Sequence, residues 1–540
     1  MISMSKSSNL GATISSNGDS VKVRCLLLCG TFDAPAKCLF QSFVQFNGSY
    51  GCPYCLHPGK TVKTSEKGHT HAYPFNRDNL QTGHFEIRTH DQTKKFAKQA
   101  TESIINTGVE KPEKGVKGLS WFLYVPAFNL IRGTAIDYMH GTLLGVVKML
   151  VNLWLDKQHH DEPWYIGKWA RELEKRYVSI KPPSCISRLP RSIVGNFGHL
   201  KASELRSFLL FYSLPCLYGL LPDSYFQHYL LLVEAIYILL KHSISSSDLT
   251  KAAKLLKHFC IRVEELYGSR YETYNIHCLL HLVDRVKDLG PLWTHSCFCF
   301  EDYNGELRHF FHGTQHVEMQ IVLSICVQQK IPELIPLLPP NSSALQFFEE
   351  LTSKGRLNQK REIVAENIFI VGAVVRHTLN VHHRQLVERD MGNVGEVFKF
   401  KRVLIGTTIF HCKDYKPGIR RNNFTVQFQS PSCPQPKYGQ ILYFIKFYVK
   451  CPNPVFCSDM CPCKVPHCRA IIEHLLRDDG TVLSTDAITG ASAPHIVPVL
   501  STSETVVIPL DMIVQVCVHI DCGSDGKRFV ATFPNMFEKD

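Results

Sequence analysis

Apolar residues recur at helical spacing through the middle of the chain. Between residue 141 and about residue 335 this spacing predicts six helices, near 141–156, 164–177, 203–214, 223–242, 247–268 and 273–288. Prolines such as Pro222 stand where these helices should end. The most apolar stretch, YLLLVEAIYILL at 229–240, contains Glu234. Because this stretch is shorter than the roughly 20 apolar residues of a membrane span, we expect a buried helix.

Runs of β-forming residues lie on either side of this helical block. Residues 21–30 (VKVRCLLLCG) predict a buried strand, with Asp33 just beyond its end. Further β-like runs occur at 368–375, 403–410, 424–428, 438–449, 505–510 and 513–520. Such short runs separated by turn residues are typical of a small β-barrel or sandwich. The Ser/Thr-rich stretch 481–503 is expected to be a mobile loop.

Composition narrows the class of protein. With 540 residues, 44% of them hydrophobic, the chain is long enough for two to four domains with cores of their own. The first twenty residues are polar and lack the apolar stretch of a secretory signal. The 21 cysteines are therefore expected to be mostly reduced, in a nuclear or cytoplasmic protein that is not secreted. The net charge of +12 favours a polyanionic partner such as DNA, and no membrane partner is expected.

Cys52 and Cys55, in CPYC, have the spacing of a metal-binding knuckle. A tetrahedral zinc ion needs two further ligands, and the nearby candidates are His57, His69, His71, His84 and His90. Among these we favour His69 and His71. The alternative is a reduced cysteine pair in a turn.

Two further groups have ligand-like spacing. His277 and His281 fall on one helical face, but Cys278 stands where a zinc protease carries glutamate, so we expect buried, hydrogen-bonded histidines. A C-terminal cluster could bind a second zinc ion, although its spacing is irregular: Cys451, Cys457, Cys461, Cys463, His467 and Cys468. In FKFKR at 398–402, lysines alternate with aromatics, which fits a solvated strand slightly better than a DNA-backbone contact.

Four patches of sequence resemble one family in their order and spacing. They are CGTFDAPAKCLF (29–40) with YGCPYC (50–55), FNLIRGTAIDYMHGTLLGV (128–146), YNIHCLLHLVDRVKDLGPLW (274–293) and FCFEDYNGELRHFFHGTQHVEMQIV (298–322). They resemble the CACTA (En/Spm) DNA transposases and the animal proteins descended from them. The likeness runs through KPPSCISRLPRSI (181–193) to FPNMFEKD (533–540).

The resemblance implies an α/β RNase H-like core with a large helical insertion, followed by a β-rich domain. In this family three carboxylates bind two divalent ions, Mg²⁺ or Mn²⁺, for phosphodiester cleavage and strand transfer. The expected organisation is a disordered leader (1–20), a partial RNase H-like core with a zinc-type loop (21–150), a helical insertion ending in the last catalytic motif (151–335), a linker (336–364) and a β-rich, barrel-like domain (365–540).

On this template Asp33 corresponds to the second catalytic carboxylate and Glu301 to the third, with Asp302 and Glu306 as competitors. Asp137 and His140 resemble an Asp-x-x-His element that lies near the active site. Structural roles are the alternatives: a helix cap for Asp33, a first-turn acid for Glu301, and a capping Asp with a hydrogen-bonded His for the DYMH pair.

The first carboxylate of the family has no clear counterpart, because Asp19 is the only acid before residue 21. We therefore expect a transposon-derived protein that resembles a cut-and-paste transposase, binds DNA and is catalytically incomplete. The alternative is a non-catalytic, domesticated DNA- or protein-binding protein. The resemblance also implies a homo-oligomer.

Overall fold

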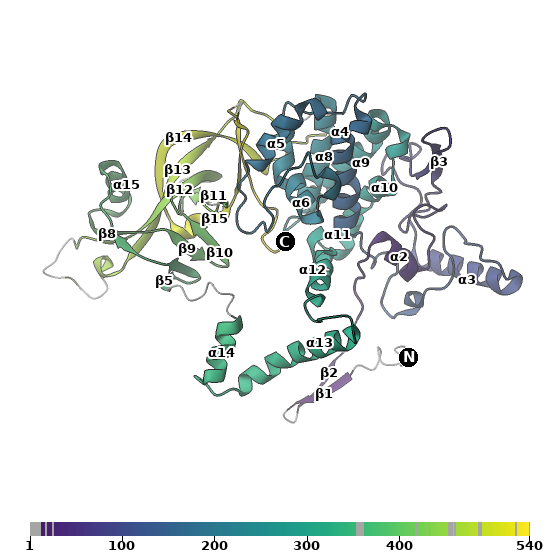
Figure 1. Cartoon of the computed structure of the whole chain (residues 1–540), viewed down its shortest axis with the longest axis horizontal. Helices are drawn as coiled ribbons and strands as arrows, with labels where there is room; N and C mark the ends of the chain where they lie inside the picture. Colours follow the sequence, from purple (N-terminus) through teal and green to yellow (C-terminus); the bar gives the residue numbers. More distant parts are fainter. Residues whose placement is uncertain are drawn as a thin grey trace.

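A helical block lies between a loop-rich N-terminal region and a β-rich C-terminal region in the computed structural model (Figure 1). The structure describes residues 12–16, 19–23, 26–352, 361–415, 420–430, 433–451, 457, 461–483, 489–523 and 526–538. Helices and antiparallel sheets are both present, so the expected mixture of fold classes is confirmed.

The predicted helices of the central block are confirmed. They are the π-helical segment η2 (Met139–Val147), α4 (Lys148–Leu155), α5 (Ala170–Val178), α6 (Ala202–Ser207), α7 (Ser213–Leu217), α8 (Asp223–Leu239), α9 (Ser246–Tyr267), α10 (Tyr274–Leu279) and α11 (Leu282–Leu289). Helix α8 is almost wholly buried, as expected. Its Glu234 is satisfied there, because it accepts hydrogen bonds from Lys251 Nζ at 2.5 Å and from the backbone N–H of Ser492 at 2.8 Å.

The strand predicted at 21–30 is wrong. Strand β2 (Asp19–Val23) pairs only with β1 (Ala12–Ser16), and the side chains of Leu26 and Leu28 are exposed. The expected disordered leader is corrected too, since this hairpin begins inside it; residues 1–11 and 17–18 lie outside the described residues. An apolar run is buried only when a neighbouring element covers it, and no described strand pairs with residues 26–29.

The rest of the N-terminal region consists of two α-helices and one hairpin joined by loops. These are α2 (Ala34–Gln41), the hairpin β3 (Lys60–Lys63) and β4 (His69–Ala72), and α3 (His90–Thr107). Within the described part of 21–150 the strands pair only as hairpins. The RNase H-like core therefore remains a prediction.

Two antiparallel sheets form the β-rich region and confirm its predicted strands. One has the order β10-β9-β6-β5, and the larger has the order β15-β11-β12-β13-β14-β17-β16, with β8 beside β12 and β7 beside β8. Apolar side chains of both sheets share a core that includes Ile370, Phe410 and Phe444. Strand bounds are β5 (Arg361–Ala365), β6 (Ile368–Val371), β7 (Val375–Arg376), β8 (Val394–Phe400), β9 (Arg402–Ile405), β10 (Thr408–His411), β11 (Thr425–Ser430), β12 (Cys433–Val449), β13 (His467–Arg477), β14 (Ile496–Pro509), β15 (Ile513–Val516), β16 (Val518–Asp521) and β17 (Arg528–Ala531).

The prediction of a mobile loop at 481–503 is wrong for its last part, because β14 begins at Ile496. Residues 484–488 of this stretch lie outside the described residues. Helix α15 (Val381–Met391) lies outside these sheets and covers the end of β8 and β14 (Figure 1).

The last strands and the C-terminal segment pack onto the helical block. Val518, Ile520 and Phe529 belong to the same buried cluster as α8 and α9. Asn535 Nδ2 donates to the carbonyl of Leu240 at 2.8 Å, beyond the end of α8. The two regions therefore share one continuous core.

Helices α12 (Phe298–Leu307), α13 (Val317–Leu334) and α14 (Ser343–Thr352) lead from the helical block to the sheets, and α13 and α14 extend away from the body (Figure 1). No residue of α12 or α13 is buried. The linker expected at 336–364 is corrected, because it contains α14 and the start of β5. Among the helices formed by described residues, none is long and apolar enough to cross a membrane.

Candidate functional site

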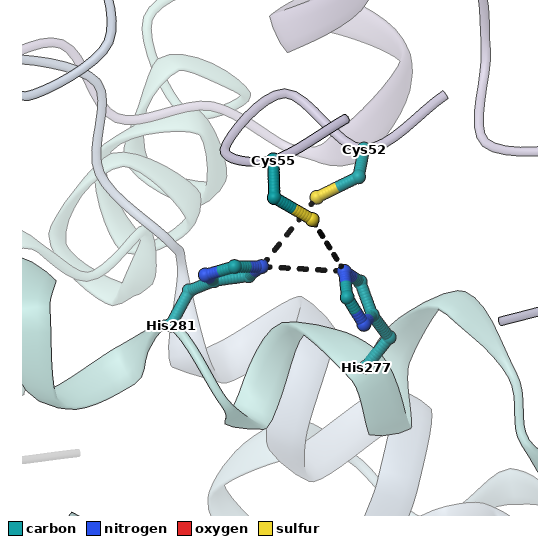
Figure 2. Close-up of side chains that lie close together, drawn as sticks. All are labelled: Cys52, Cys55, His277 and His281. Atoms are coloured by element: carbon teal, nitrogen blue, oxygen red, sulfur yellow. Dashed lines mark hydrogen bonds between the residues drawn. The ribbon is translucent and has the colours of Figure 1, made fainter. Parts of the chain in front are cut away.

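Four metal-ligating side chains meet where the N-terminal loop lies on the helical block. Cys52 and Cys55 come from the loop, His277 lies on α10, and His281 is the N-cap residue of α11 (Figure 2). All four are buried. One ligand atom of each lies within 4.8 Å of the others.

The distances match the edges of a tetrahedron. Cys55 Sγ lies 3.3 Å from His277 Nε2, and Cys52 Sγ lies 3.7 Å from His281 Nε2. The two imidazole Nε2 atoms are 3.2 Å apart. Ligands at ordinary zinc–sulfur and zinc–nitrogen distances from one ion are separated by about 3.3 to 3.8 Å. The group could therefore hold a metal ion such as zinc.

This arrangement corrects the histidines that the sequence favoured. His69 is exposed on β4, and the ring of His71 lies against Gly59 and Tyr73. Neither belongs to the cysteine group. Both histidines belong to β4, which pairs with β3 in a short hairpin. This pairing, and not the CPYC turn, sets the direction of their side chains.

The other nearby histidines use a ring nitrogen for a backbone contact. His57 Nδ1 accepts from the N–H of Gly59 at 2.8 Å, while its Nε2 lies 2.9 Å from the carbonyl of Pro74. His84 Nδ1 lies 2.9 Å from the carbonyl of Phe85. His90 Nδ1 accepts from the N–H of Leu130 at 3.1 Å. These contacts organise the loop around the cysteines.

Arg88 holds the CPYC turn in shape. Its buried guanidinium donates from Nε to the carbonyls of Cys52 and Cys55, at 2.9 and 3.2 Å. The Nη2 atom donates to the carbonyls of Tyr50 and Lys114. Gly51 is needed beside the turn, since a Cβ there would lie 2.6 Å from the Tyr73 hydroxyl. These contacts hold both cysteines facing α10 and α11 (Figure 2).

The histidines are fixed by the helices that carry them. Thr273 caps α10 by accepting from the N–H of Ile276, and its carbonyl accepts from the N–H of His277. Burial alone would raise the pKa of the Cys52 thiol, but the Cys55 thiol and the two imidazoles lower that pKa well below its usual value. A thiolate facing two imidazoles is the chemical form that binds a metal ion.

A hydrogen-bond chain connects this group to α2. Tyr54, between the two cysteines, accepts from the buried Lys37 Nζ at 2.9 Å and donates to the carbonyl of Ala135 at 2.9 Å. The guanidinium of Arg285, on α11, lies over the Tyr54 ring at 5.3 Å. The metal-ligating loop therefore also positions the helix that begins after Asp33.

The predicted catalytic residues gather beside this chain of contacts. Gly30 forms a parallel bridge with Thr134, which brings the segment before Asp33 alongside the segment before Asp137. A cavity of about 430 Å³ is lined by Asp33, Lys37, Asp137 and His140. Asp33 also caps α2, where it accepts from the N–H of Ala36 at 2.8 Å.

Asp137 is committed to several hydrogen bonds. It accepts from the N–H of His140 at 3.0 Å, from His140 Nδ1 at 2.6 Å and from the N–H of Cys297 at 2.9 Å. Burial alone would raise the pKa of Asp137, but the hydrogen bonds from His140 and Cys297 lower that pKa below its usual value. Because Cys297 is the N-cap of α12, Asp137 also anchors the helix that carries Glu301.

Glu301 faces the other nitrogen of the same imidazole. His140 Nε2 lies 4.0 Å from Glu301 Oε1, and the Glu301 side chain is 56% exposed. The hydrogen bond to Asp137 raises the pKa of His140, with smaller contributions from the charges of Glu301 and Asp33. Asp137 and Glu301 therefore face the two nitrogens of one imidazole, Asp33 lines the same cavity as that imidazole, and the catalytic role of these residues stays a prediction.

A larger groove opens on the Glu301 side. Its volume is about 1340 Å³, and it is lined by His140, Glu301 and Asp302 together with the basic residues Lys148, Arg188, Arg191 and Lys201. The lysines of the FKFKR strand do not line this groove. Lys399 forms an ion pair with Asp414 at 3.2 Å. Arg421 is likewise used internally, donating to the carbonyls of Pro183, Ile186 and Ser187.

The sequence contained a signal for the four-ligand group. The CPYC turn has the first half of a Cys₂His₂ spacing, and the HCLLH segment has the second half. The two halves lie 222 residues apart, counted from Cys55 to His277. Only the fold brings them together.

No protein-family model and no curated protein matches the chain.

The contacts of His140 predict its titration. In Mg²⁺-free buffer we expect a pKa above the usual value of about 6.5, measured by NMR on the ring protons. Asp137→Asn should lower this pKa strongly, because it removes the leading hydrogen bond, whereas Glu301→Gln should lower it less. Since the pKa is raised on folding, the contact stabilises the fold below the unfolded-state pKa, and this contribution is lost as the pH rises through the folded-state pKa. An unchanged pKa in Asp137→Asn would contradict the assignment.

Proposed function

We propose that this chain is a nucleic-acid-binding protein related to the CACTA transposases, and that it binds the phosphate backbone in the groove beside His140 and Glu301. The observation that carries the proposal is the set of basic side chains along that groove. Lysine and arginine bind phosphates through charge, with release of the counterions of the nucleic acid.

Three of these cations are available for a ligand. In the described part of the chain, Lys148, Arg188 and Lys201 have no carboxylate within ion-pair distance. Arg191 differs, since its guanidinium binds Glu204 at 2.5 Å and donates to the carbonyl of His199. We assign Arg191 to holding the 188–201 segment in place, and the other three to phosphate contacts.

Glu301 lines the groove, and Asp33 lines the neighbouring cavity, which shares His140 with the groove. Asp33 and Glu301 carry carboxylate oxygens of the kind that Mg²⁺ or Mn²⁺ prefers, and a divalent ion bound there would polarise a phosphate oxygen. Asp137 is already occupied by hydrogen bonds from His140 and Cys297. Two remaining carboxylates hold one ion loosely, whereas two-metal phosphodiester cleavage needs two ions in register. We therefore favour nucleic-acid binding without efficient cleavage.

The Cys₂His₂ group has a structural role in this proposal, with zinc as its ion. Protein side chains fill all four tetrahedral positions, which is typical of structural zinc sites; catalytic sites keep one position for water or substrate. The ion would bind the loop of Cys52 and Cys55 to α10 and α11. Through Tyr54 and Lys37 it would also fix the helix next to Asp33.

The zinc assignment predicts the metal content of variants. His277→Ala/His281→Ala should lose one equivalent of zinc and unfold at a temperature roughly 5 °C lower, because loss of a structural zinc ion removes several kcal/mol of stability. Elemental analysis and thermal unfolding of the full chain measure both effects. The matched control, His69→Ala/His71→Ala, should keep its zinc. Loss of zinc in that control, with retention in the first variant, would contradict the assignment.

The groove assignment predicts salt-dependent DNA binding. A labelled duplex should bind the full chain with an affinity that falls as salt rises, and Arg188→Ala/Lys201→Ala should weaken binding and reduce the log–log salt slope by about two. Fluorescence anisotropy measures this. Lys95→Ala/Lys98→Ala, on the exposed side of α3, is the charge-matched control and should bind normally.

The same samples should show no nicking of the duplex with Mg²⁺ or Mn²⁺. Equal binding by the groove variant and the control would contradict the groove assignment. Metal-dependent nicking that disappears in Asp33→Ala would instead show a complete catalytic centre.

A further inference from the structure

Four cysteines lie together at the end of the β12–β13 hairpin. Cys451 follows the last residue of β12 by two positions, Cys463 precedes β13 by four, and Cys457 and Cys461 lie between them. The Sγ atoms of Cys451 and Cys461 are 3.8 Å apart, and those of Cys457 and Cys463 are 3.4 Å apart. All four sulfur atoms lie within 4.8 Å of one another.

These distances fit a shared ion better than disulfides. Four thiolates around one zinc ion are separated by about 3.8 Å, since each zinc–sulfur bond is about 2.3 Å. A disulfide requires a sulfur–sulfur distance of about 2.05 Å. A disulfide would bring only two thiols together, whereas four thiols converge here, and this also favours tetrahedral coordination of an ion.

The structure narrows the cluster that the sequence suggested. Cys468 is buried in the core between the two sheets, and it does not belong to the four-sulfur group. The ring of His467 lies beside Phe447 and also remains outside the group. Both residues belong to β13, where the ladder with β12 fixes their direction: Phe447 pairs with His467 and Lys446 with Cys468.

The position of the cluster explains what an ion would do. The β12–β13 ladder ends at the pair Phe447 and His467. Beyond that pair, the four cysteines are half-buried and belong to none of the hydrophobic clusters formed by the described residues. An ion bound to Cys451 and Cys463 would join the two ends of the segment that connects β12 to β13. It would thereby reduce the conformational freedom of that segment.

We infer that Cys451, Cys457, Cys461 and Cys463 form a second, structural zinc site at the end of the β12–β13 hairpin. Tetrahedral thiolate sites take zinc or iron, and zinc is the ion that serves a closed structural site without redox chemistry. The site is independent of the Cys₂His₂ group, because the two share no residue and lie in different regions of the fold.

The experiment is metal analysis of the full chain combined with zinc X-ray absorption. The wild-type protein should carry two zinc ions with an average coordination of three sulfurs and one nitrogen. Cys457→Ser/Cys463→Ser should lose one ion and shift the average to two sulfurs and two nitrogens. The matched control, Cys299→Ser/Cys326→Ser, changes two exposed cysteines outside the cluster and should keep both ions.

The wild-type spectrum tests the site even if the variant does not fold. A single zinc ion with two sulfurs and two nitrogens would overturn this inference and leave the Cys₂His₂ assignment intact. A single zinc ion with four sulfurs would support this inference and overturn the other. Iron in place of zinc, or disulfides among the four cysteines in freshly purified protein, would also overturn it.

Discussion

The contact between the CPYC turn and the HCLLH helices is the constraint on which the rest of the site depends. Cys52 and Cys55 lie in a loop of the N-terminal region, whereas His277 lies on α10 and His281 just before α11; both cysteines belong to the buried cluster of the helical block. Side chains from the two regions meet at 3.3 and 3.7 Å. A metal ion at this point would add a direct bond between the loop and the helices across a contact that is already buried.

The predicted catalytic carboxylates are positioned indirectly by the contact between the CPYC turn and the helices. Tyr54, within the CPYC turn, binds Lys37 of α2, and α2 begins after Asp33. Asp137 anchors Cys297 at the start of α12, which carries Glu301. The acids are therefore positioned by a loop and two helix ends. No sheet among the described residues carries them, which differs from the rigid strands that the family resemblance implies. This mounting suits a binding groove better than a two-metal catalytic centre.

Local patterns in the sequence predicted individual helices and strands. The helical spacing predicted α8 and α9, and short β-forming runs separated by turn residues predicted β11 and β12. The pattern failed where burial depends on a distant partner: residues 21–30 are apolar enough for a buried strand, yet Leu28 is exposed because no described strand pairs with residues 26–29. The prediction of the metal-ligating histidines failed for the same reason, since the favoured His69 and His71 are held on a separate hairpin. Two ligand pairs 222 residues apart require knowledge of the tertiary fold.

Hydrogen–deuterium exchange of Cys52→Ser/Cys55→Ser tests most directly whether one ion binds the two regions together. The substitutions lie only in the loop and leave its other contacts with the helices in place, among them Tyr54 with Arg285, so a change in α10 and α11 would report on the shared site. We expect faster exchange in residues 274–289 as well as in the loop around Arg88, with the β12–β13 hairpin unchanged. Faster exchange confined to residues 50–57, with α10 and α11 as protected as in the wild type, would contradict the account.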